Sequence, residues 1–309
     1  MAYEKSEQFP CFLCESVAGR IPHALLFETE LAVAVMSPHQ RSEGAVLVMP
    51  KRHALNCTQL TKEETVAVMS LLCKSARAVC KTYKPDGLHT FCNAGKKAGQ
   101  SVPHMHFQIQ TRYYDRSYAF GSSSNFPIIP IEKLLANAKK IRQAEQENHN
   151  FNFLFSIKKE CLCDPIPKAI GHFRKEGTLI KETSNFFAVV PEQNRIRGAL
   201  VILPKRNVSN YLELNDNEST ELILLISDLS QAIENFYDPI GLSLWSEIGI
   251  VADQIYKHLL VELVPYHADV KDKDYKYQNR TMLTITPIEE RIKTTQAIKT
   301  FLKDKLFAK

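Results

Sequence analysis

The sequence predicts an α+β protein of two similar domains, each an antiparallel sheet packed against one long helix. Three observations support this prediction. The chain has 309 residues, a length that suits two domains of ordinary size. It repeats itself at one fixed offset. Both repeats place short apolar runs, which are typical of strands, on either side of one long pattern with helical spacing.

The repeat relates residues that lie 154 positions apart, since Gly44 corresponds to Gly198. The two matching runs are Gly44-Ala-Val-Leu-Val-Met-Pro-Lys-Arg52 and Gly198-Ala-Leu-Val-Ile-Leu-Pro-Lys-Arg206. The same offset holds without a gap from residue 25 to residue 104. We call the two stretches the first copy and the second copy. Chance does not readily explain one offset over so many residues, so we expect both copies to fold alike.

The first copy combines a long helix with short strands. Thr61-Lys-Glu-Glu64 has the residues of a capping box, so we expect the helix to begin there. A turn with Pro85 and Gly87 ends it. The apolar stripe of the helix consists of Val66, Met69, Leu72, Ala76 and Val79. The strand candidates are 31–36, 45–49, 88–93 and 104–111.

The second copy shows the same order of elements. Asn215 is the expected N-cap of its helix, and a turn with Pro239 and Gly241 ends that helix. The apolar stripe consists of Leu222, Leu225, Leu229, Ile233 and Phe236. The strand candidates are 186–190, 199–203, 242–250 and 258–265.

The remaining segments connect and extend the two copies. Gly121-Ser-Ser-Ser-Asn125 predicts a surface loop, and 131–146 has the pattern of a linker helix. The tail is charged over 269–274, and a helix is expected from Pro287 onward. The expected division is a first, catalytic domain over 1–115, a loop and linker helix over 116–155, a second domain over 156–267, and a charged tail with a helix over 268–309.

Composition excludes several classes of protein. No apolar run reaches the ~18 residues of a membrane span, and the first residues lack a signal-peptide pattern. The net charge of +5 suits an anionic substrate, but no dense basic run indicates nucleic acid. Eight cysteines are too sparse for a disulfide scaffold, so we expect reduced thiols and a cytoplasmic location. The cysteines expected to serve only packing are Cys57, Cys73, Cys80, Cys92, Cys161 and Cys163.

One strand candidate carries an unusual row of polar residues. In His104-Met-His-Phe-Gln-Ile-Gln110, strict alternation places polar side chains on one face and apolar ones on the other. A small-residue turn at 93–101 precedes it, and backbone N–H groups of such a turn can bind phosphate oxygens. Imidazole is a competent nucleophile near neutral pH. The alternative is a solvent-facing edge strand with chance histidines. The polar face consists of His104, His106, Gln108 and Gln110.

The second copy lacks this set of polar side chains, which favours the functional interpretation. A merely structural polar face would be expected in both copies. We therefore expect one working site and one scaffold copy. The replacements are Leu260 for His106, Glu262 for Gln108 and Glu247 for Asn93.

Cys11-Phe-Leu-Cys14 has the spacing of half a tetrahedral zinc site. His53 and His104 are candidates for the missing ligands, because the second copy has Asn207 in place of His53. The nearest thiols of the second copy, Cys161-Leu-Cys163, have poor spacing for zinc. A redox pair and two unrelated thiols are the alternatives, although no thioredoxin-like βαβ pattern follows the motif.

Together, these residues resemble the histidine-triad (HIT) superfamily of nucleotide hydrolases and transferases. The similarity extends over residues 9–112, and the second copy resembles a degenerate HIT domain over about 165–266. The resemblance implies two HIT-like domains and binding of a nucleotide phosphate. The motifs that carry it are Cys11-Phe-Leu-Cys14, Gly19-Arg-Ile-Pro22, Pro50-Lys-Arg-His53, Asn93-Ala-Gly95, Ala98-Gly-Gln-Ser-Val102 and His104-Met-His-Phe-Gln108.

The resemblance also implies a role for each residue. His106, the middle histidine of the triad, would attack the α-phosphorus and form a covalent nucleotidyl-histidine. Gln108 replaces the third histidine, as in the branch with galactose-1-phosphate uridylyltransferase and the diadenosine tetraphosphate phosphorylases, and would hold phosphoryl oxygens. Ser101 matches a phosphate-contacting hydroxyl. The implied substrate-binding residues are Asn93, Gly99, Gln100 and His104, and the implied ligands of a structural zinc ion are Cys11, Cys14, His53 and His104.

The function implied is that of a nucleotidyltransferase or phosphorylase acting on a dinucleoside polyphosphate or a nucleotide sugar. A HIT-type hydrolase with water as acceptor is one alternative, and a non-catalytic nucleotide-binding protein is another. A nucleotide phosphate is the expected partner, and neither a membrane nor a nucleic acid is expected. The second copy is expected to cover the active face or to form the surface of a homodimer.

Overall fold

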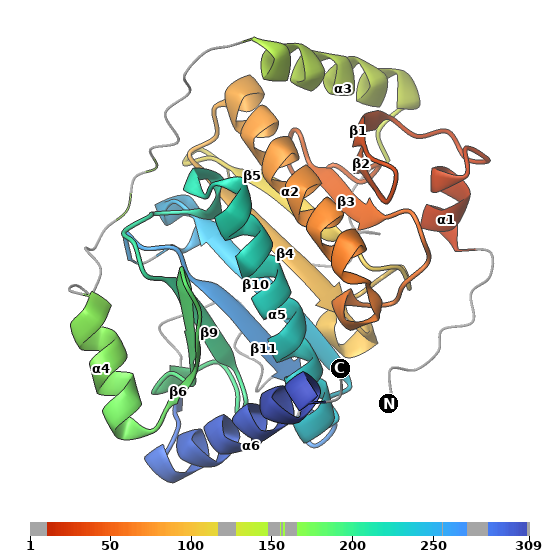
Figure 1. The fold of residues 1–309 in the computed structure, drawn as a ribbon. Coiled ribbons are helices and arrows are strands. Elements are labelled where there is room, and N and C mark those ends of the chain that lie inside the picture. The colour runs from red at the N-terminus through yellow and green to blue at the C-terminus, as the bar shows by residue number, and fades with distance from the viewer. Residues whose placement is uncertain are drawn as a thin grey trace.

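The computed structural model describes residues 11–116, 128–147, 166–254, 256–270 and 284–307, together with Phe155 and Ile157. Within these residues, ten strands form one antiparallel sheet that runs through both copies (Figure 1). The strand order is β1-β2-β3-β5-β4-β10-β11-β9-β7-β6. Each copy contributes five consecutive strands, so the predicted α+β class is confirmed, and the two sheets prove to be one.

The first copy and the segment after it contain three helices and five strands. Two short 3-10 helices, Cys57–Gln59 and Lys96–Ala98, interrupt its loops. The elements are α1 (Phe12–Val17), β1 (Leu25–Glu28), β2 (Ala32–Met36), β3 (Val46–Pro50), α2 (Lys62–Tyr83), β4 (Gly87–Ala94), β5 (Phe107–Arg112) and α3 (Ile131–Gln146).

The second copy repeats this order, and a separate two-stranded sheet connects it to the C-terminal segment. In that sheet, β8, which follows β7 in the chain, pairs antiparallel with β12. The elements are α4 (Ile166–Glu176), β6 (Leu179–Glu182), β7 (Phe186–Val189), β8 (Gln193–Asn194), β9 (Leu200–Pro204), α5 (Asp216–Tyr237), β10 (Gly241–Ile248), β11 (Val261–Tyr266), β12 (Thr284–Ile285) and α6 (Ile288–Phe307).

The two copies meet at the centre of the sheet, where β4 pairs antiparallel with β10. The register runs from Leu88 opposite Ile248 to Ala94 opposite Leu242. The long helices α2 and α5 lie side by side over one face of this junction (Figure 1). Because the strands and the helices both meet their counterparts, one apolar core spans both copies.

Both long helices begin where the sequence predicts. The Thr61 hydroxyl accepts from the Glu64 backbone N–H at 3.2 Å, and the Glu64 carboxylate accepts from the Thr61 N–H at 2.8 Å. Asn215 and Glu218 form the same reciprocal pair at the start of α5.

The predicted apolar stripes of α2 and α5 are largely buried, with two corrections. Val66 is only half-buried, since Val68 faces the core. Phe236 is 37% exposed, because Tyr237 packs against the core instead.

The strand that carries the polar row begins later than predicted. β5 starts at Phe107, so His104 and His106 lie in the segment before it. The reason is a change of backbone partner, because the Met105 N–H donates to the Ala54 carbonyl and the His104 N–H to that of Val102. β5 is an interior strand between β3 and β4, which rules out the alternative of a solvent-facing edge strand.

The connecting segments agree with the predicted linker helix and C-terminal helix. α3 spans the predicted residues, and α6 packs against α5. The expected loop at Gly121–Asn125, Cys161 and Cys163, and the tail beyond residue 270 up to 283 lie outside the described residues. None of the helices in the described part of the chain has the length and apolar character needed to span a membrane.

Candidate functional site

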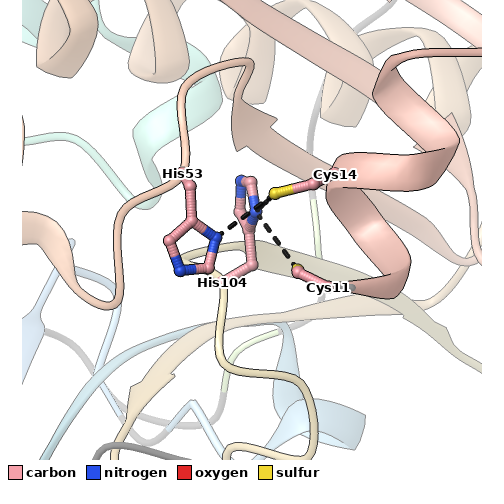
Figure 2. A group of neighbouring side chains, drawn as sticks. All are labelled: Cys11, Cys14, His53 and His104. Atoms are coloured by element: carbon pink, nitrogen blue, oxygen red, sulfur yellow. Dashed lines mark hydrogen bonds between the residues drawn. The ribbon is translucent and has the colours of Figure 1, made fainter. Parts of the chain in front are cut away.

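Four metal-ligating side chains converge beside the first copy's sheet (Figure 2). Cys11 and Cys14 come from the start of α1, His53 from the loop after β3, and His104 from the segment before β5. Cys14 Sγ lies 3.2 Å from His53 Nδ1 and 3.4 Å from His104 Nδ1. Cys11 Sγ lies 3.7 Å from His104 Nδ1. The structure thus brings together all four residues that the sequence proposes as zinc ligands.

The His104 ring is oriented by a backbone carbonyl. Its Nε2–H donates to the Pro50 carbonyl at 3.0 Å, which leaves the Nδ1 lone pair facing the two sulfurs. Burial lowers the pKa of His104 to about 4, so the ring is neutral at neutral pH. In the second copy, His258 makes the same bond to the Pro204 carbonyl at 3.0 Å, which identifies this bond as part of the shared fold.

The His106 ring bonds to the backbone through its other nitrogen, Nδ1, whereas His104 uses Nε2. Its Nδ1–H donates to the His104 carbonyl at 2.7 Å, so the lone pair resides on Nε2. Gln108 Nε2 lies 3.4 Å from this lone pair and donates to it. Burial lowers the pKa of His106, and the Arg41 charge lowers it further, so the neutral imidazole is favoured. The ring therefore presents an unprotonated nitrogen beside an amide donor.

His106 opens into a cavity of about 540 Å³. Its polar lining includes Arg41, Ser101, His106 and Gln108. Its apolar lining comes from α1, β3 and the start of α3. Cavities that combine an apolar wall with a few convergent polar groups are typical of small-ligand sites. The apolar lining includes Phe12, Leu13, Leu47, Ile129, Ile131 and Leu134.

Three of the residues proposed to bind substrate do not line this cavity. The described residues that line the cavity do not include Asn93, Gly99 or Gln100. Asn93 accepts a hydrogen bond from Ser243 of β10 at 2.8 Å. Gln100 braces its own loop, since its amide accepts from the Gly95 N–H at 2.8 Å and donates to the Leu55 carbonyl at 2.8 Å. A phosphate contact by these three residues stays a prediction.

Gln254 of the second copy makes the same two bonds as Gln100, to the Gly249 N–H and to the Ser209 carbonyl. The bracing of this loop is therefore independent of a working site. Of the proposed substrate-binding residues, His104 is fully buried and faces the two cysteines rather than the cavity.

Arg41 is a cavity residue that no motif indicates, but the repeat points to it. Its counterpart, Arg195, is buried in the second copy and donates to Glu262 at 2.5 Å and to Glu247 at 3.4 Å. In the first copy, neutral amides replace both carboxylates, at Gln108 and at Asn93. The first copy thus keeps the cation and has amides where the second copy has the acids that neutralise it.

The linker also contributes to the cavity, which the sequence does not reveal. The Ile129 N–H donates to the Pro38 carbonyl at 3.0 Å, and Ile128 forms a bridge with His39. These backbone bonds fix the segment before α3, and Ile131 and Leu134 of α3 line the cavity.

Comparison with known proteins finds a family similarity in the part of the chain that contains this site. The family model "HIT domain" matches residues 18–115. "Protein hit" of Bacillus subtilis is 40% identical over 103 residues, which cover 33% of this chain and 71% of that protein. "Adenosine 5'-monophosphoramidase hnt1" of Schizosaccharomyces pombe is 33% identical over 123 residues, which cover 40% of this chain and 89% of that protein.

Two solved structures extend the likeness of fold over both copies. A uridylyltransferase superposes with a TM-score of 0.56 at 19% identity, over 85% of this chain and 77% of that chain. An ADP-glucose phosphorylase from Arabidopsis thaliana superposes with a TM-score of 0.56 at 14% identity, over 90% of this chain and 85% of that chain. At these identities the likeness concerns the fold alone. The identity to the bacterial and yeast proteins, over most of their length, shows that the chain belongs to the HIT domain family and is an enzyme of that family.

Proposed function

We propose that the first copy transfers a nucleoside monophosphate by way of a covalent bond to His106 Nε2. The donor is a dinucleoside polyphosphate or a nucleotide sugar, and the acceptor carries a phosphate. One observation carries this proposal. The His104 carbonyl holds the Nδ1–H of His106, so Nε2 carries the lone pair, and this ring lines the cavity with its Nε2 next to the Gln108 amide.

The reaction divides into two displacements at one phosphorus atom. In the first, Nε2 attacks the α-phosphorus, a P–N bond forms, and the P–O bond to the leaving phosphate breaks. In the second, an acceptor oxygen attacks the same phosphorus, and the P–N bond breaks. The imidazole is neutral again at the end of the cycle. Gln108 and Ser101 line the same cavity, so their amide and hydroxyl would stabilise the charge that develops on the phosphoryl oxygens.

Arg41 supplies the positive charge for the same group. In the second copy, the corresponding guanidinium is neutralised by two buried carboxylates, whereas in the first copy these positions are amides. Arg41 lines the cavity, so an anionic substrate bound there would lie close to its positive charge. This argument favours a phosphate-bearing ligand over a neutral one.

The second candidate function is hydrolysis with water as acceptor. The similarity to the yeast monophosphoramidase favours it, because that similarity covers most of the yeast protein. Both functions use the same first displacement and differ only in the second. The identity of the product distinguishes them.

We also propose that Cys11, Cys14, His53 and His104 hold one structural Zn²⁺ ion. The ligand atoms all lie within 4.8 Å of one another. Tetrahedral zinc with ordinary bond lengths places its ligand atoms about 3.3–3.8 Å apart, and the sulfur–nitrogen distances in the structure are 3.2, 3.4 and 3.7 Å. Burial and the Cys11 thiol raise the pKa of Cys14 to about 11, so a cation is needed to favour the thiolate. Zinc would tie α1 to the segment that carries His106.

A donor panel tests the proposed function. Diadenosine tetraphosphate, ADP-glucose, UDP-glucose and adenosine phosphoramidate are each supplied with and without inorganic phosphate, and the products are identified. We expect nucleoside diphosphate release that depends on phosphate, and its loss in His106→Ala. Leu260→Ala, at the matching position of the second copy, is the control and should retain activity. Monophosphate release regardless of phosphate would favour hydrolysis. Tight nucleotide binding without turnover would contradict both functions.

A further inference from the structure

A row of polar side chains continues from His106 along β5. Gln108, Gln110 and Arg112 alternate with Phe107 and Ile109, which face the main core. Gln110 and Arg112 are each only 4% exposed. Polar groups at this depth are held by specific hydrogen bonds, so their arrangement is informative.

The hydrogen bonds of this row run in one direction. Arg112 Nη2 donates to Gln110 Oε1 at 3.0 Å. Gln110 Nε2 donates to Gln108 Oε1 at 3.4 Å. Gln108 Nε2 in turn lies 3.4 Å from His106 Nε2, the atom proposed as nucleophile.

The guanidinium determines that direction. Arginine has donors and no acceptor, so Gln110 must turn its oxygen toward Arg112 and its NH2 group toward Gln108. Gln108 then accepts with its oxygen and presents its own NH2 group to His106. A carboxamide without such neighbours can be turned over, since its two ends have nearly the same shape.

The anchor of the row is itself held from the neighbouring strand. Arg112 Nη2 also donates to Nδ1 of His89 at 3.1 Å, and His89 lies opposite Gln110 in the β4–β5 register. The Arg112 guanidinium is therefore held by two acceptors, Gln110 Oε1 and His89 Nδ1.

The row exists only in the copy that contains His106. In the second copy, Val264 and Tyr266 stand at the positions of Gln110 and Arg112, and neither can continue such a chain of amides. Glu262, at the position of Gln108, instead accepts from Arg195. If the row served the sheet alone, the equally buried β11 would need it too.

We propose that Arg112 and Gln110 are positioning residues, which keep the NH2 group of Gln108 directed at the phosphoryl group on His106. This inference rests on the proposed function, because it concerns the amide that contacts the substrate. An amide turned the other way would set its oxygen against a phosphoryl oxygen, and two acceptors repel. The row thus makes Gln108 a donor at all times.

The test reverses the orientation of the Gln108 amide by a substitution that keeps the size of the side chain at position 110. In Gln110→Glu, a carboxylate accepts from Arg112 but cannot donate to Gln108, so the Gln108 amide must turn its NH2 group away from His106. We expect kcat to fall about tenfold or more, the effect of losing one donor to the transition state, while KM changes little. In Gln110→Leu nothing selects an orientation, so we expect a loss of about twofold, as for two comparable conformers. Gln193→Glu, at the exposed residue of β8, is the matched control and should behave as wild type.

A double variant separates positioning from a general structural role. If Gln110 acts through Gln108, then adding Gln110→Glu to Gln108→Leu should change kcat by less than about twofold. A full tenfold loss in that background would overturn the proposal. So would a Gln110→Glu variant whose kcat lies within twofold of wild type.

A spectroscopic readout keeps this inference distinct from the proposed function. The side-chain amide signals of Gln108 are identified in ¹⁵N NMR spectra by their absence in Gln108→Leu. We expect the Gln108 NH2 protons to move downfield in Gln110→Glu, because they then bond to a carboxylate. Unchanged signals would overturn the positioning role. If wild type turns over no donor while these signals move, the proposed function fails and the positioning of Gln108 stands.

Discussion

At the scale of single residues, the repeat separates side chains that serve the fold from those that serve the site. Gly44 and Gly198 occur in both copies, both with φ of +78°. A Cβ on either would lie 2.5 Å from the ring of the tyrosine that ends the long helix, Tyr83 or Tyr237. His106, by contrast, has a leucine as its counterpart. A feature kept by both copies supports the shared fold, whereas one found in a single copy points to chemistry.

Gly44→Ala is expected to destabilise the protein. The substitution combines left-handed backbone strain of about 1–3 kcal/mol with a clash against the Tyr83 ring. The free energy of unfolding in urea measures the effect. Gly19→Ala is the matched control, because Gly19 has φ of +72° and a Cβ placed there would meet no atom within 4 Å. If Gly44→Ala costs no more than Gly19→Ala, the contact with Tyr83 does not explain why glycine stands there.

Arg41→Met is expected to weaken substrate binding. Arg41 lines the cavity, and methionine keeps much of the bulk while removing the charge. We expect KM for the preferred donor to rise about tenfold or more, the range for losing a charge-assisted hydrogen bond, and the salt dependence of KM to weaken. The measurement is steady-state kinetics at two ionic strengths. An unchanged KM would show that Arg41 does not contact the substrate.

At the scale of elements, local patterns predict much of the secondary structure. The capping residues Thr61 and Asn215 mark the starts of α2 and α5, and the helical pattern of 131–146 matches α3. The short elements α1, β1 and β6 could not be predicted in this way, because their few residues carry no periodicity. The late start of β5 could not be predicted either, since the Met105 N–H bond to Ala54 joins segments far apart in the chain.

The site shows the same division between local and long-range information. The spacing of His106 and Gln108 is local, so the sequence indicates both residues. The cavity walls come from α1, β3 and the start of α3, and their meeting depends on backbone bonds such as that from Ile129 to Pro38. Arg41 lies in no motif, and only the exchange of acids for amides at an offset of 154 points to it.

The four side chains proposed to bind zinc come from three segments, which leads to a prediction about zinc. The ligands connect α1 to the loop after β3 and to the segment before β5. We expect about one zinc per chain by elemental analysis, and a lower Tm after chelation, because the ion cross-links these segments. Cys14→Ser should lose most of the metal, whereas Cys73→Ser, a buried thiol outside the cluster, should keep it. Zinc-free wild-type protein with an unaltered Tm would contradict this prediction.

At the scale of the whole molecule, the continuous sheet makes the two copies one structural unit. Trp245 of β10, the single tryptophan of the chain, stacks on Phe91 of β4 with ring centroids 5.6 Å apart. Arg77 of α2 donates to the Leu212 and Leu214 carbonyls of the second copy at 3.0 and 2.7 Å. Contacts across both layers predict that neither copy unfolds alone.

Unfolding should therefore be a single transition. We expect tryptophan fluorescence, which reports the junction, and far-UV circular dichroism, which reports all helices, to give the same midpoint in urea. Gly44→Ala in the first copy and Gly198→Ala in the second should each lower both midpoints together. Two separate midpoints, or a shift in only one signal, would mean that the copies unfold independently.

The central claim is that His106 of the first copy, and no residue of the second copy, carries the covalent nucleotidyl intermediate, and mass spectrometry can measure this directly. The intact mass of the protein is determined after rapid acid-free quenching of a reaction with an accepted donor and no acceptor. We predict one nucleoside monophosphate adduct per chain, located on His106 by peptide mapping and absent in His106→Ala. A protein that turns over the donor without any adduct, or with the adduct on a residue of the second copy such as His258, would contradict the account.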